Sequence, residues 1–96
     1  MIDKETFQVL NYVKKEEYTG SMEGMRYMLR KKTEGEQTVL EVILWPEPFG
    51  YGKTPEQKKQ RAVFPLNAEG LGQAVDWMNV QYETQGELWK IVRRSV

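Results

Sequence analysis

The sequence contains no cysteine and no histidine in its 96 residues. Without cysteine there can be no disulfide, thiol nucleophile or thiolate metal site, and this usage is typical of a reducing compartment. Without histidine there is no Ser-His nucleophile pair, no zinc site of the usual kind and no side chain with an ordinary pKa near neutrality. We therefore expect a protein that is not an enzyme and uses no cofactor or metal, with carboxylate and lysine chemistry as the routes left open.

Excess charge and long apolar runs are missing as well. Fourteen basic and fourteen acidic residues give a formal net charge of +0, so only a local patch could attract nucleic acid or an anionic membrane. No apolar run approaches the roughly 20 residues needed to span a bilayer. The N-terminus has charges at positions 3, 4 and 5 where a secretory signal has an apolar segment. We expect one globular domain over residues 1–96, located in the cytoplasm and with no membrane partner.

Helix and strand patterns along the chain predict an α+β fold. Two helices are expected, one after a cap at Asp3 and one after a cap at Asn67, each with an apolar stripe at helical spacing. Between them, residues 20–24 are expected to form a polar break, and Gly35 to lie at a hairpin turn. Alternation predicts strands over residues 25–32, 38–45 and 61–66. The expected order is α-β-β-β-α, a three-stranded antiparallel sheet with two helices packed on one face.

The strand expected over residues 38–45 is largely apolar on both faces. One face can lie under the helices, whereas the other, which carries Ile43 and Trp45, must be covered or stay exposed. Either the loop from Trp45 to Lys53 folds back over this face, or a protein partner covers it. The second alternative predicts a non-catalytic protein-interaction module that binds another protein or a second copy of itself as a homodimer. The expected protein-binding residues are Met28, Ile43, Trp45, Phe49, Tyr51 and Trp77.

Basic residues beside aromatic ones give an alternative function, nucleic-acid binding. The candidate residues are Arg26, Arg30, Lys31, Lys58, Lys59 and Arg61. The α-β-β-β-α order resembles the double-stranded RNA-binding domain, but that family has lysines where this last helix begins Asn67-Ala68-Glu69-Gly70, with an acid. Zero net charge also disfavours phosphate binding. The competing interpretation is ordinary solvated charge, with Glu41 facing Arg26 or Arg30 across the hairpin.

The tripeptide Gly52-Lys53-Thr54 matches the end of a phosphate-binding loop. The complete motif needs a glycine five residues before Gly52, where this chain has Glu47. Such loops also require a parallel sheet with crossover helices, which this strand order does not provide. We therefore interpret the segment as a glycine loop that leads into a short helical turn capped by Thr54, with Pro55 at its first position.

Three segments in this order carry a resemblance to a known group of proteins: "GSMEGMRYMLRKK", "LEVILWPEPFGYGKTPEQKK" and "EGLGQAVDWMNVQYE". They resemble short bacterial proteins of gut Gram-positive bacteria that are often found on mobile elements. Some members are described as GNAT-type acetyltransferases, which hold the coenzyme A pyrophosphate with a basic, glycine-spaced loop at a helix start. The comparable helix start here, "NAEGLGQ", is acidic. The resemblance implies a bacterial cytoplasmic protein and adds a third alternative, a mobile-element accessory factor such as an inhibitor of host defence.

Overall fold

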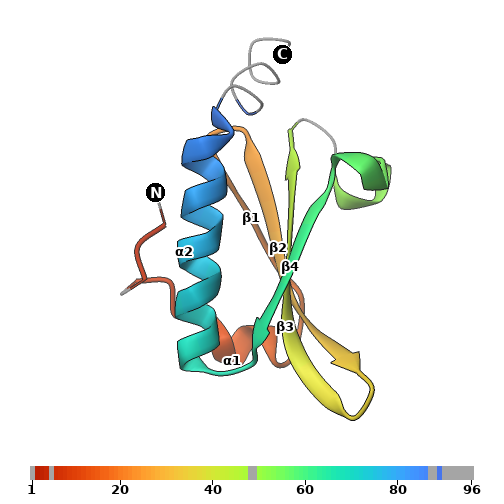
Figure 1. The fold of residues 1–96 in the computed structure, drawn as a ribbon, viewed down its shortest axis with the longest axis vertical. Coiled ribbons are helices and arrows are strands. Elements are labelled where there is room, and N and C mark those ends of the chain that lie inside the picture. Colours follow the sequence, from red (N-terminus) through yellow and green to blue (C-terminus); the bar gives the residue numbers. More distant parts are fainter. Residues whose placement is uncertain (1, 5, 48–49, 87–88, 90–96) are drawn as a thin grey trace.

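A computed structural model of the chain describes residues 2–4, 6–47, 50–86 and 89. Over these residues the fold is one antiparallel sheet with helices on one side (Figure 1), so the predicted α+β class is confirmed. The helices are α1 (Leu10–Val13) and α2 (Ala68–Thr84), and the 3₁₀ turns are η1 (Tyr51–Lys53) and η2 (Glu56–Lys58). The strands are β1 (Tyr18–Met22), β2 (Met25–Glu34), β3 (Gln37–Pro46) and β4 (Gln60–Pro65).

The four strands follow one another in space as they do in sequence, in the order β1-β2-β3-β4. Glu23 and Gly24, between β1 and β2, both have positive φ, which is what a two-residue type I′ hairpin turn requires. Gly35 turns the β2–β3 hairpin at φ 61°, close to the predicted position. Pairing of β4 with β3 begins only at Val39. The tip of the β2–β3 hairpin therefore projects beyond the rest of the sheet (Figure 1).

The prediction of three strands was wrong, because residues 18–22 form an additional edge strand. Tyr18 and Met22 pack against the core, while Thr19 and Ser21 are exposed, so this strand alternates although it is polar and contains a glycine. The Tyr27 ring explains the glycine: a Cβ at Gly20 would lie 2.5 Å from the Tyr27 hydroxyl. The sequence pattern treats glycine as a break, whereas here glycine makes room for an aromatic ring that lies over the strand.

The first helix is much shorter than predicted. The Asp3 carbonyl accepts the N–H groups of Thr6 and Phe7, but these form an isolated turn, and α1 itself begins at Leu10 without a side-chain cap. Phe7 packs edge-on against Tyr18 at a centroid distance of 5.6 Å. Packing of the Phe7 ring thus holds this segment on the core without a continuous helix, because tertiary contacts override a weak local preference.

The second helix follows the prediction closely. The Asn67 side chain accepts a 2.7 Å hydrogen bond from the Gly70 N–H, as an N-cap does. Leu71, Ala74 and Met78 are buried against the inner face of the sheet. Both helices contribute to this single core, so they cover the same face, and the opposite face of the sheet is left for other contacts.

Candidate functional site

Charged side chains gather at the centre of the sheet face opposite to α1 and α2, which we call the open face. On β3, Glu41 points to this face, and its neighbours in register are Arg30 on β2 and Val63 on β4. Lys32 and Arg61 point the same way, because strand side chains alternate with a period of two. Neither α1 nor α2 covers these side chains, so the candidate site is a surface and not a closed cavity.

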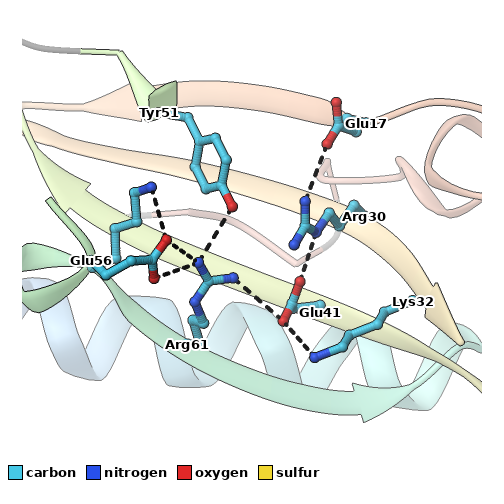
Figure 2. Close-up of polar contacts among 8 residues, drawn as sticks. Glu17, Arg30, Lys32, Glu41, Tyr51, Glu56 and Arg61 are labelled. Atoms are coloured by element: carbon cyan, nitrogen blue, oxygen red, sulfur yellow. Dashed lines mark hydrogen bonds and ion pairs between the residues drawn. The ribbon is translucent and has the colours of Figure 1, made fainter. Parts of the chain in front are cut away.

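The Glu41 carboxylate is the centre of this cluster and is only 3% exposed. It accepts hydrogen bonds of 2.6 Å from Arg30 Nε and 3.3 Å from Lys32 Nζ, and Arg61 Nη1 lies 3.6 Å away (Figure 2). Burial alone would raise the pKa of Glu41, but the hydrogen bonds and charges of Arg30 and Lys32 outweigh it and hold this pKa below its ordinary value. Glu41 is therefore ionised at neutral pH and fixes three cations.

Two further carboxylates pair with the same arginines from outside the sheet. Arg61 Nη2 donates to both oxygens of Glu56, at 2.9 and 2.7 Å, and Arg30 Nη1 lies 3.6 Å from Glu17. The Glu56 bond is the main reason why the pKa of Arg61 is raised above its ordinary value. In contrast to Glu41, the side chains of Glu17 and Glu56 are 56% and 69% exposed. Each arginine therefore joins one buried carboxylate to one exposed carboxylate (Figure 2).

Tyr51 lies beside this network on the loop that follows β3. Its ring packs edge-on against Trp45 at a centroid distance of 5.6 Å, and Lys59 Nζ lies 3.7 Å from the ring centroid. The Tyr51 hydroxyl accepts a 3.3 Å hydrogen bond from Arg61. This bond, together with the nearby positive charges, lowers the pKa of the Tyr51 hydroxyl. Tyr51 is thus held between an apolar layer below and cations around it.

Thr54 holds the loop in this position, but it is not the helix cap that the sequence predicts. The Thr54 hydroxyl donates a 2.8 Å hydrogen bond back to the Gly50 carbonyl, and its side chain is buried. The turn that follows, η2, has no side-chain cap. Thr54 therefore closes the turn that carries Tyr51, and Gly52-Lys53-Thr54 serves to shape this loop.

The residues predicted to bind a protein partner occupy three different environments. Met28, Ile43 and Trp45 form a small cluster under Tyr51 and are buried within the single chain. Trp77 lies on the helix side, where it packs against Phe64 at a centroid distance of 6.1 Å. Phe49 lies outside the described residues. The chain thus covers this part of the sheet itself, the first of the two alternatives that the sequence left open, and Tyr51 remains partly accessible on top of it.

The predicted nucleic-acid-binding residues are brought together only in part. Arg30, Lys59 and Arg61 converge on the Tyr51 ring. Lys31 points away from the open face, because it pairs in register with the core residue Leu40. The remaining two are Arg26, 3.9 Å from Glu47, and Lys58, which is exposed on η2.

The opposition of Glu41 and Arg30 across the hairpin is confirmed, and Arg26 takes a different partner. Lys32 belongs to the basic cluster of the sequence but was not among the predicted binding residues, and Glu17 and Glu56 were not expected in the network. Lys32 could have been found from its two-residue spacing from Arg30. Glu56 could not, because the loop conformation places it on Arg61.

The chain matches no protein-family model, no curated protein and no solved structure. The resemblance to short bacterial proteins therefore stays a prediction.

Other parts of the described chain offer weaker candidates. A hollow of about 470 Å³ between α1 and the end of β2 is lined by Lys15, Glu16, Glu17 and Lys31 among others, and it adjoins the same network through Arg30. Among the described residues no group of three or more acidic, histidine or cysteine side chains could hold a metal ion. The described helices are also too short or too polar to cross a membrane.

Proposed function

We propose that the protein is a non-catalytic protein-binding module that uses the open face of its sheet. The observation that carries this proposal is the arrangement of Arg30, Arg61 and Tyr51 on a face that neither helix covers. Arginine and tyrosine are enriched among the residues that dominate protein interfaces. Here the arginines project from β2 and β4, on either side of β3, and Tyr51 from a closed turn, so they lose little conformational freedom on binding. Val63, 49% exposed beside them, adds apolar surface.

The partner in this proposal is a different protein. Four cations of the network face three carboxylates, and one of these carboxylates is buried. One unit of positive charge is left over on each face, so two copies would meet with like charge and no complementary patch, which disfavours a homodimer through this surface. Light scattering after size exclusion tests this point. A dimer that persists at low and high salt and is dissociated by Arg61→Glu would contradict it.

Site-specific photo-crosslinking tests the proposal, because the chain offers two matched positions. Val63 on the open face and Val80 on the outer side of α2 are 49% and 51% exposed. A photo-reactive benzophenone amino acid is placed at either position, and the protein is irradiated in a lysate of the cells that produce it. We expect a discrete protein adduct through position 63 and none through position 80. The adduct at position 63 should disappear when Arg61→Gln is added.

Several outcomes of the crosslinking experiment would contradict the proposal. Equal adducts at both positions, adducts at position 80 alone, or none at position 63 would refute binding through the open face. An adduct that nuclease treatment removes would favour the nucleic-acid alternative. That alternative has Arg30, Lys59 and Arg61 around Tyr51 in its favour. It is the weaker proposal, because Glu17, Glu41 and Glu56 already neutralise most of this charge.

A further inference from the structure

The two arginines of the open face are bound in the same way, and this shared pattern indicates the chemistry of a partner. Arg30 places Nε on the buried Glu41 at 2.6 Å and Nη1 toward the exposed Glu17 at 3.6 Å. Arg61 places Nη1 toward Glu41 at 3.6 Å and Nη2 on the exposed Glu56 at 2.7 Å. In each guanidinium one side holds the side chain on the sheet, and the other side meets a carboxylate at the surface.

The two outer carboxylates can be exchanged, whereas Glu41 cannot. Glu17 lies on the connection between α1 and β1, and Glu56 lies on η2, so neither belongs to the sheet. Both are more than half exposed, so water and salt compete for their ion pairs with the arginines, and such pairs contribute little to stability. Glu56 also lies 3.3 Å from Lys59 Nζ, whose side chain is 5% exposed and packs on the Tyr51 ring as a second contact. Glu41 is buried and bound by three cations. Displacement of the outer carboxylates would therefore leave the arginines in place.

The charge of the network changes strongly when the outer carboxylates leave. Arg30, Lys32 and Arg61 would then keep the carboxylate of Glu41. Lys59 would lose its ion pair with Glu56 and keep its contact with the Tyr51 ring. An approaching carboxylate would find Nη2 of Arg61, which now donates to Glu56, and Nη1 of Arg30, which now lies 3.6 Å from Glu17. The described part of the open face has two such places, at Arg30 and at Arg61, which suits a short acidic segment better than the many phosphate contacts of a nucleic acid.

We infer that the open face binds an acidic segment of a protein partner, whose carboxylates replace Glu17 and Glu56 on Arg30 and Arg61. This inference rests on the proposed protein-binding function and adds the chemical class of the partner. Glu17 and Glu56 then act as internal competitors that the partner displaces. Glu41 acts as a positioning residue that keeps the two guanidinium groups on the sheet.

A titration with defined probes tests this inference on the full chain. The probes are a short glutamate homopeptide, a glutamine homopeptide of the same length and a single-stranded DNA oligonucleotide, each added to ¹⁵N-labelled protein at low salt. We expect the glutamate peptide to bind and to shift the Nε–H resonances of Arg30 and Arg61. The glutamine peptide should not bind, and salt should weaken the glutamate complex.

The decisive comparison uses two variants with the same change in net charge. Glu56→Gln removes an internal competitor, whereas Glu83→Gln removes an exposed carboxylate from α2, on the other side of the molecule. Glu56→Gln should tighten binding of the glutamate peptide about two- to fivefold relative to Glu83→Gln. Glu17→Gln should act in the same direction through Arg30. Arg61→Gln should weaken binding about tenfold or more.

The outcomes separate this inference from the proposed function. Equal affinities of Glu56→Gln and Glu83→Gln, or no binding of the glutamate peptide, would overturn the exchange of carboxylates. If position 63 still gives a protein adduct in that case, the open face binds a protein of different chemistry. Tighter binding of the oligonucleotide than of the glutamate peptide, with the same dependence on Glu56, would overturn both proposals.

Discussion

Gly70 provides the sharpest test of how the sequence builds this fold. It is buried in the first turn of α2, where its N–H binds the Asn67 cap. A Cβ at this position would overlap the carbonyl oxygen of Pro65 and lie 2.7 Å from the Pro65 carbonyl carbon, closer than the 3.0 Å that real Cβ atoms respect. Because a Cβ is fixed rigidly to the α2 backbone and the atoms that it meets are backbone atoms of Pro65, the overlap can be relieved only if the start of α2 moves away from the end of β4.

The contact at Gly70 also sets the expected loss of stability, and Gly72 in the same helix provides a control. Gly70→Ala should lower the free energy of unfolding by about 3 kcal/mol, from overpacking of roughly 1–3 kcal/mol and a weakened cap of about 1 kcal/mol. Gly72→Ala is the control, because a Cβ there meets nothing within 4 Å. It should raise the free energy of unfolding by up to about 1 kcal/mol, since alanine is the better helix former.

Urea unfolding followed by circular dichroism measures both variants, with an unchanged m-value as the sign that the same transition is compared. The reasoning would be refuted if the two alanine variants had free energies of unfolding within about 0.5 kcal/mol of each other.

Three further predictions concern the open face. The pKa of Glu41 lies below its ordinary value, so its contribution to stability is complete above about pH 4.3 and is lost as the pH falls through the lower pKa of the folded state. Glu41→Gln should therefore flatten the acid dependence of the free energy of unfolding, and an unchanged pH profile would contradict the network. Tyr51→Phe should change the free energy of unfolding by less than about 1 kcal/mol. Tyr51→Ser should uncover Trp45 and shift the tryptophan fluorescence to the red. Equal fluorescence spectra for the two variants would contradict the packing of Tyr51 on Trp45. Trp45→Ser should lower the free energy of unfolding by about 3 kcal/mol or more, because its side chain is buried, and wild-type stability in urea would place Trp45 at the surface instead.

The elements that could be predicted from the sequence are those set by local periodicity. Alternation placed Ile43 and Trp45 on the face away from the helices, as the structure has them, and Leu40, Val42 and Leu44 lie in the core on the opposite face. The Asn67 cap was also predicted, because an N-cap depends only on residues within one turn.

The features that could not be predicted depend on contacts between distant residues. β1 escaped prediction because Gly20 is explained only by the ring of Tyr27, which lies opposite it on the next strand. For the same reason the covering of Trp45 by its own loop could be predicted only as one of two alternatives, since Tyr51 is held by Lys59 and Arg61 from beyond the turn. The sequence predicted that Glu41 faces Arg26 or Arg30 across the hairpin, and Arg30 is its partner in the structure. This pairing could be predicted because cross-strand neighbours follow from the hairpin register.

Arg30 and Arg61 each contact one buried carboxylate and one exposed carboxylate, and these two partners differ in how freely they can be substituted. The buried end of each arginine depends on Glu41, in the middle of a paired strand, where a substitution would disturb the fold. The outer ends depend on positions 17 and 56, which lie on connections that tolerate substitution more readily. Residues at these two positions can therefore vary between lineages and retune the surface charge, while the strands beneath them and the core stay the same.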